Sequence, residues 1–134
     1  TPQLPQSSID IIFSTLVIAH VRKIQNLFEF WDTLLKPSGT IIITDMHPEI
    51  LSAGGKRTFT HHTKNYEIKN FIHSLKEIEQ ICKQLNLKIE ECQEKRITSD
   101  LKGYYAKHNA LHIYEQFKEK PLIYGMRIRK TIAP

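Results

Sequence analysis

The stretch that decides the fold runs from Ile9 to Asp45 and reads IDIIFSTLVIAHVRKIQNLFEFWDTLLKPSGTIIITD. It opens with the apolar, β-branched run of residues 9–13 and closes with a second such run at residues 40–44, and both are typical of strands buried on two faces. Between them, apolar side chains recur at the spacing of one helix face: Ile24, Leu27, Phe28, Trp31, Leu34 and Leu35. Two buried strands joined by a covering helix predict a parallel pair with a right-handed crossover, the core of an α/β fold.

The end of this helix is predicted from the sequence of residues 36–39, Lys-Pro-Ser-Gly. Pro37 has no amide hydrogen to donate, so it cannot continue the helical ladder, and Gly39 is expected to take the tight turn. The helix is therefore expected over residues 24–36. Asp45 ends the second strand and is expected only to cap the turn that follows.

The remainder of the chain predicts further strands and helices. Residues 56–69 predict a hairpin inserted after the second strand, with polar residues at its tip. Ser74 and Glu77 have the spacing of a capping box and open a helix over residues 74–86. Apolar residues at helical spacing predict another helix over residues 108–119. The four main strands are expected near residues 9–14, 40–45, 87–97 and 121–130.

Composition narrows the class of protein. The 134 residues make one domain, and 40% hydrophobic with 25% charged residues is ordinary for a soluble globular chain. No apolar run approaches the ~20 residues that cross a bilayer, so no membrane contact is expected. Cys82 and Cys92 are too few for a disulfide framework, which favours a reducing, cytoplasmic location. The net charge of +5 permits an acidic partner without requiring one.

Several segments, in their order along the chain, carry a family resemblance. They are Leu4-Pro5, the run from Ser8 to Ser14, the triplet Ala19-His20-Val21 and the run from Leu34 to Asp45. Together they closely resemble the second half of a class I S-adenosylmethionine-dependent methyltransferase of the small-molecule type, and a weaker likeness continues through residues 47–48 and 65–86. Ser38 stands where the family's closing L-K-P-G-G motif has its first glycine. The resemblance implies a Rossmann-like sheet of parallel strands with a final antiparallel strand.

The features that hold the cofactor in the first half of such a domain are not found in this chain. None of its five glycines forms a G-x-G turn after a strand, and the acidic residue that accepts from the ribose hydroxyls is also missing. Residues 1–134 are therefore expected to be the C-terminal portion of one methyltransferase domain, whether truncated deliberately, by proteolysis or in the gene. The missing N-terminal half is its expected partner. Alone, the chain is expected to bind S-adenosylmethionine weakly or not at all, to be inactive, and to self-associate through strand 9–14.

The resemblance also implies which residues meet the cofactor. Ser14, Thr15 and Leu16 follow the first strand, where the family lines the methionine end of the cofactor. The plainer interpretation is that a strand end needs small polar residues to satisfy its amides. Thr1 and Leu4 fall near the family's adenine-contacting pair, although the acidic residue expected just upstream is absent.

Two histidines are candidate catalytic residues. His20 ends the loop after the first strand, and His47 follows the next strand. The resemblance places both at the active crevice, where a neutral imidazole can take a proton from an acceptor hydroxyl or amine. The alternative for His20 is a hydrogen bond that only holds its own loop.

The methyl acceptor is expected to lie against segments that vary within the family. Four candidate residues fall in those segments: Tyr66, His73, Tyr104 and Tyr105. Aromatic residues there can bound a small-molecule pocket, although aromatics more often simply pack. His108 and His112 are one helical turn apart, but no third ligand is evident, so no metal site is predicted.

Three functions remain open from the sequence. The first is methyl transfer to a small-molecule acceptor. The second is an RNA or nucleic-acid methyltransferase or binding module, suggested by the net charge and the basic run of residues 127–130. The lysines are spread along the whole chain, however, without aromatic–basic interleaving. The third is a non-catalytic half-domain that acts in assembly.

Overall fold

The computed structural model describes residues 3–131, and its centre is a four-stranded mixed sheet. Its strands are β1 (Ile9–Thr15), β2 (Leu35–Met46), β5 (Leu87–Arg96) and β6 (Pro121–Lys130), in the order β1-β2-β6-β5. β1 and β2 are parallel, with Ile12 opposite Ile41, and β6 runs antiparallel to both of its neighbours. The predicted α/β fold, with a parallel first pair and a final antiparallel strand, is confirmed.

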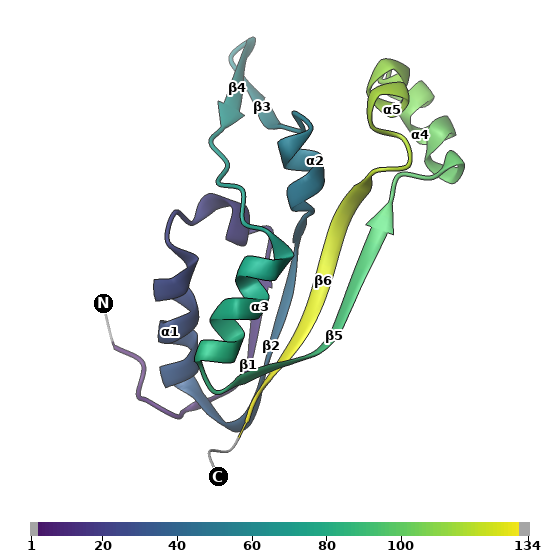
Figure 1. Ribbon diagram of the computed structural model, residues 1–134. Coiled ribbons are helices and arrows are strands. Elements are labelled where there is room, and N and C mark those ends of the chain that lie inside the picture. The colour runs from purple at the N-terminus through teal and green to yellow at the C-terminus, as the bar shows by residue number, and fades with distance from the viewer. Residues whose placement is uncertain (1–2, 132–134) are drawn as a thin grey trace.

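Two helices, α1 (Ile24–Leu34) and α3 (Leu75–Gln84), lie on the same face of this sheet (Figure 1). Their apolar stripes pack against the inward-facing residues of the strands. We call this cluster the main core; its fully or almost fully buried members include Ile24, Phe28, Leu35, Ile41, Ile43, Ile78 and Ile128. The capping prediction at α3 is confirmed in part, because the Ser74 hydroxyl accepts from the Glu77 amide at 3.0 Å.

No helix within residues 3–131 covers the opposite face of the sheet (Figure 1). We call this surface the bare face; it presents the alternate residues Ile11, Phe13, Ile42 and Ile123, which point away from the main core. Its β6 part also carries Arg127 and Arg129, which lie opposite Ile42 and Thr40. Phe13 is 73% exposed and Ile11 is 53% exposed. The apolar part of the bare face, beside β1, is therefore a candidate contact surface.

The turn between α1 and β2 differs from the prediction in two ways. Helix α1 ends at Leu34 and β2 begins at Leu35, five residues before the predicted strand. Ser38, rather than Gly39, takes the left-handed conformation, with φ of 64°. Gly39 is needed for space, because a Cβ there would lie 2.9 Å from the Lys36 carbonyl oxygen and 3.2 Å from that of Asp10.

Two excursions extend beyond the end of the sheet at which β1 and β2 finish. The first contains the short helix α2 (Pro48–Ser52) and the hairpin of β3 (Arg57–His61) and β4 (Lys64–Ile68), which lies within the predicted range of residues 56–69. That this hairpin is an insertion stays a prediction. His62 and Thr63 form the tip, both with positive φ.

The second excursion joins β5 to β6. The helix predicted over residues 108–119 is confirmed, with narrower bounds, as α5 (Leu111–Phe117). The 3₁₀ turn η2 (Ser99–Leu101) and the helix α4 (Lys102–Lys107) precede it and are additional elements that the prediction lacks. Asn109, with φ of 53°, separates α4 from α5, a conformation that asparagine tolerates. Residues of both excursions, together with Ala19 from the loop after β1, form a second core: Ala19, Ile50, Leu51, Ile97, Tyr114 and Phe117.

Candidate functional site

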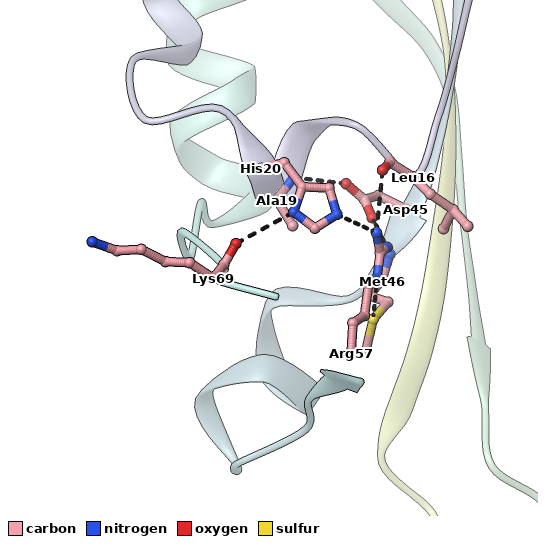
Figure 2. Close-up of polar contacts among 7 residues, drawn as sticks. All are labelled: Leu16, Ala19, His20, Asp45, Met46, Arg57 and Lys69. Atoms are coloured by element: carbon pink, nitrogen blue, oxygen red, sulfur yellow. Dashed lines mark hydrogen bonds and ion pairs between the residues drawn. The ribbon is translucent and has the colours of Figure 1, made fainter. Parts of the chain in front are cut away.

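The carboxyl ends of β1 and β2 carry a connected group of polar side chains, Asp45, Arg57 and His20, which we call the strand-end cluster (Figure 2). Asp45 comes from the end of β2, and Arg57 is the first residue of β3. His20 belongs to the 3₁₀ turn η1 (Ile18–His20), which follows β1. Ligands of open α/β sheets bind at this edge, so the cluster lies where a functional site is expected.

Asp45 is the centre of the cluster. Its side chain is 1% exposed and accepts from the amides of Ala19 at 2.8 Å and Met46 at 2.7 Å. The Arg57 guanidinium donates to the same carboxylate from Nη2 at 2.7 Å. A buried carboxylate requires such partners, and here they join η1, β2 and the hairpin to one side chain.

Arg57 fixes the protonation pattern of His20. Its Nη1 donates to the Leu16 carbonyl oxygen at 3.1 Å and contacts His20 Nε2 at 2.6 Å. A guanidinium has only donors, so Nε2 must accept and the ring proton of a neutral His20 lies on Nδ1. Nδ1 faces the Lys69 carbonyl oxygen at 3.3 Å, which accepts that proton (Figure 2).

His47 lies below the surface and has a structural contact. It is 3% exposed, and its Nδ1 accepts from the Glu49 amide at 3.1 Å as the N-cap of α2. Its Nε2 lies 3.5 Å from Glu94, and its ring meets Tyr124 edge-on. Burial raises the pKa of the Tyr124 phenol, and the charge of Asp45 raises it further, so this phenol is protonated at neutral pH. The catalytic role of His47 stays a prediction.

The residues predicted to meet the cofactor divide into two groups. Ser14, Thr15 and Leu16 lie together at the carboxyl end of β1, beside the strand-end cluster. The Ser14 hydroxyl is buried and has no hydrogen-bond partner among residues 3–131. Leu16 turns the chain with φ of 58°, and its amide donates to the Thr44 carbonyl oxygen at 2.8 Å.

Leu4 precedes β1 and therefore lies at the opposite end of that strand from Leu16; the structure does not bring them together. Its side chain is 56% exposed. Thr1 lies outside the described residues. The adenine contacts predicted for Leu4 and Thr1 stay predictions.

The four residues predicted to meet the acceptor do not form one wall. Tyr66 stacks on Phe59 in the hairpin, with ring centroids 5.2 Å apart. His73, which lies just before α3 in the chain, contacts the Val21 carbonyl oxygen through Nε2 at 2.6 Å. Tyr104 is 62% exposed on α4. Tyr105 lines a cleft, so it is the one of the four that faces a sizeable hollow.

This hollow, which we call the insertion cleft, lies between the two excursions and has a volume of about 470 Å³. Its lining comes from α2 and the turn after it, from β3, from α4 and α5, and from the adjoining ends of β2, β5 and β6: Met46, Ile50, Gly54, Gly55, Lys56, Thr58, Ile97, Tyr105, Ile113, Gln116, Phe117 and Leu122. Met46 connects it to the strand-end cluster, because its sulfur also accepts from Arg57 Nε at 3.0 Å.

Sequence reasoning missed Arg57 and underestimated Asp45. Asp45 is expected from the sequence only to cap a turn, whereas the structure makes it the hub of three elements. The available signal was an acidic residue in a strand predicted to be buried, because such a charge needs a partner. Nothing in the sequence identifies Arg57, rather than a neighbouring lysine, as that partner.

Within residues 3–131, no three His, Cys, Asp or Glu side chains are grouped closely enough to hold a metal ion. No helix in the described part of the chain has the length and apolar character needed to cross a membrane.

Comparison with known proteins gives matches only among solved structures. No protein-family model and no curated protein matches the chain. An S-adenosylmethionine-dependent methyltransferase from Mesorhizobium loti matches 96% of this chain with a TM-score of 0.66 and 15% identity. A putative S-adenosylmethionine-dependent methyltransferase from Listeria monocytogenes matches 98% of it with a TM-score of 0.69 and 11% identity.

A third match is a Burkholderia thailandensis 1,6-didemethyltoxoflavin-N1-methyltransferase with bound S-adenosylhomocysteine, at a TM-score of 0.52, 15% identity and 95% of this chain. The chain spans 65% of the Mesorhizobium and Listeria proteins and 46% of the Burkholderia protein. Sequence identity this low shows only that the fold is shared. The resemblance predicted from the sequence is thereby confirmed for the fold: the chain is built like part of a class I S-adenosylmethionine-dependent methyltransferase.

Proposed function

We propose that this chain is part of a methyltransferase that transfers a methyl group from S-adenosylmethionine to a small-molecule acceptor. The observation that carries the proposal is the fold match, which extends over 96% and 98% of the chain in the Mesorhizobium and Listeria methyltransferases. The connected polar cluster at the carboxyl ends of β1 and β2 supports it, because that edge is where such sheets bind their ligands.

The chain's own residues fit one end of the cofactor. The buried Ser14 hydroxyl, which has no hydrogen-bond partner among residues 3–131, offers a polar group for the amino-acid end. The backbone of Leu16 beside it is already held by Thr44 and Arg57 and shapes the turn. A bound S-adenosylmethionine supplies an already activated methyl group, so the protein needs mainly to position the acceptor. No glycine-rich turn or ribose-binding carboxylate was recognised in the sequence, so the nucleoside end needs residues from elsewhere.

We therefore propose that residues 1–134 form the C-terminal portion of one methyltransferase domain and that an N-terminal half completes it. The matched methyltransferases are longer than this chain, and the apolar bare face offers a surface for such a half. Methyl transfer then requires both halves, and this chain alone is inactive.

His20 is the better placed of the two candidate catalytic histidines, because His47 is buried as a helix cap. In the arrangement seen, Arg57 occupies the Nε2 lone pair of His20. His20 thus orients the loop after β1, and it can accept a proton from an acceptor only when the Arg57 contact opens. Arg57 and Asp45 act as positioning residues for that loop.

The nucleic-acid alternative loses support from the basic strand β6. Arg127 lies 3.3 Å from Glu91, and Arg129 lies 2.9 Å from Glu90. Lys130 approaches Asp32 at 3.5 Å. The cations that suggested nucleic-acid binding therefore face carboxylates on neighbouring elements, so this part of the surface carries less net positive charge than residues 127–130 alone suggest.

Titration calorimetry separates these functions. We expect the chain alone to bind S-adenosylmethionine more weakly than about 1 mM, or not measurably, because the nucleoside end is not held. We expect no binding of a single-stranded RNA at low or moderate salt. Micromolar affinity for S-adenosylmethionine would contradict the half-domain proposal, and RNA binding that weakens steeply with salt would favour the nucleic-acid alternative.

A further inference from the structure

We propose that the insertion cleft binds a small apolar molecule that carries one anionic group. The proposal follows from the lining of the cleft and does not depend on methyl transfer; it rests on the proposed function only for the ligand's identity as the methyl acceptor. The volume of about 470 Å³ lies within the range of roughly 300–1,000 Å³ that small-molecule pockets occupy.

The walls of the cleft are mainly apolar. Ile50, Ile97 and Phe117 belong to the second core and are 8% exposed or less. Ile113 also lines the cleft and is 38% exposed, although a large aliphatic side chain gains by being covered. An apolar ligand body would cover Ile113 and extend the second core.

The single charge in the lining is positive. Lys56 lies among the lining residues, and no carboxylate accompanies it there. Its Nζ lies 3.3 Å from Glu67 in the hairpin, but both side chains are more than half exposed, so this ion pair is weak. Lys56 can therefore turn to an anionic ligand at little cost. Thr58, Tyr105 and Gln116 add neutral hydrogen-bonding groups that would orient it.

The two glycines in the lining keep the cleft open on the side of α2. Gly54 has φ of 99° and no atom within 4 Å of a Cβ placed there, so this part of the wall has no side chain. Gly55 packs so closely on α2 that a Cβ would lie 2.6 Å from the Ile50 carbonyl oxygen. A side chain at position 54 is disfavoured by the positive φ, and a side chain at position 55 is disfavoured by the close contact with Ile50.

The chain has two methionines, and they make a matched pair of probes. Met46 lines the cleft, whereas Met126 lies in the main core and lines other hollows of the sheet, separate from the cleft. A shift at Met126 therefore reports binding elsewhere. We would label both methyl groups with ¹³C and titrate the chain with anilinonaphthalene sulfonate, an apolar ring system with one anionic group. We expect the Met46 methyl resonance to shift saturably and the Met126 resonance to stay in place.

Charge and site are tested by substitution. Lys56→Gln should weaken binding of anilinonaphthalene sulfonate by about fivefold, the scale of an exposed ion pair. The same substitution should leave binding of phenylnaphthylamine, its uncharged counterpart, unchanged. Ile113→Trp should fill the cleft and abolish the Met46 shift for both probes, and Thr58→Trp is a second filling variant. Ile11→Trp makes the same change on the bare face and should have no effect.

The proposed site would be refuted if only the Met126 resonance shifted. It would also be refuted if Ile11→Trp abolished binding while both filling variants kept it. Equal sensitivity of the two probes to Lys56→Gln would overturn the anionic class. Neither readout involves S-adenosylmethionine, so a failure here is distinct from a failure of the proposed methyl transfer.

Discussion

Replacing Arg57 with methionine is expected to lower the free energy of unfolding by about 3 kcal/mol and to release the β3–β4 hairpin. The substitution removes the guanidinium from the buried Asp45 carboxylate, which keeps only its two amide donors. Breaking a buried ion pair by removing one partner typically costs about 3–5 kcal/mol. Arg57 is 16% exposed, so we expect the lower end of that range. Urea unfolding monitored by circular dichroism measures the change.

The release of the hairpin is a separate, local consequence of the same change. Every residue of β3 and β4 other than Arg57 is exposed, so Arg57 is the main attachment of the hairpin to the sheet. Amide hydrogen exchange in the hairpin should accelerate more than exchange in β2. Arg127→Met is the matched control, because its ion pairs are about half exposed and should contribute less than about 1 kcal/mol. Equal destabilisation by the two substitutions would contradict the role assigned to Arg57.

The second large effect concerns the bare face. We expect the chain alone to self-associate as its concentration rises, and Phe13→Lys to weaken that association by at least about tenfold. The outer edge of β1 has no neighbouring strand among the described residues, and Phe13 beside it is 73% exposed. An open strand edge next to apolar side chains is a template for pairing with another chain. Burying one phenylalanine side chain contributes about 1.5–3 kcal/mol to the free energy of association, which corresponds to at least a tenfold change in affinity.

Phe30→Lys serves as the control for this effect. Phe30 is 55% exposed but lies on α1, away from the bare face. Light scattering over a range of protein concentrations should give a smaller average mass for Phe13→Lys and no change for Phe30→Lys. A wild-type chain that stays monomeric at all concentrations, or a Phe30→Lys effect equal to that of Phe13→Lys, would refute the edge argument.

The sequence predicted best those elements whose signal is local. The strand, helix and strand from Ile9 to Asp45 were predictable because each one carries its own periodicity and each is covered by residues close in sequence. The hairpin was predictable for the same reason. The position of each side chain within a strand was harder to predict. Ile12 packs against the main core while its neighbour Phe13 is exposed, and an all-apolar run does not show which alternate residues face inward.

Features that depend on tertiary contacts were not predictable in this way. The helical stripe within residues 108–119 predicted α5, but α4 has no buried residue and therefore no comparable apolar stripe to predict it. The strand-end cluster joins residues 20, 45 and 57, which are far apart in sequence. Lys56, next to Arg57, could equally have been the partner of the buried carboxylate. Only the fold determines which arginine or lysine reaches a buried carboxylate. The sequence therefore directed attention to the strand ends, where the cluster lies, but it did not identify the central pair of Asp45 and Arg57. The functional roles of the predicted site residues stay predictions.

The most direct test of the central claim is to map ligand contacts residue by residue. Amide resonances of the ¹⁵N-labelled chain would be followed during titration with S-adenosylhomocysteine, and in parallel with adenosine, which lacks the amino-acid end. We predict weak, progressive shifts at Ser14, Thr15 and Leu16 with S-adenosylhomocysteine and none at these positions with adenosine. Identical responses to the two ligands, or shifts confined to residues away from the carboxyl end of β1, would contradict the claim that this edge holds the methionine end of the cofactor.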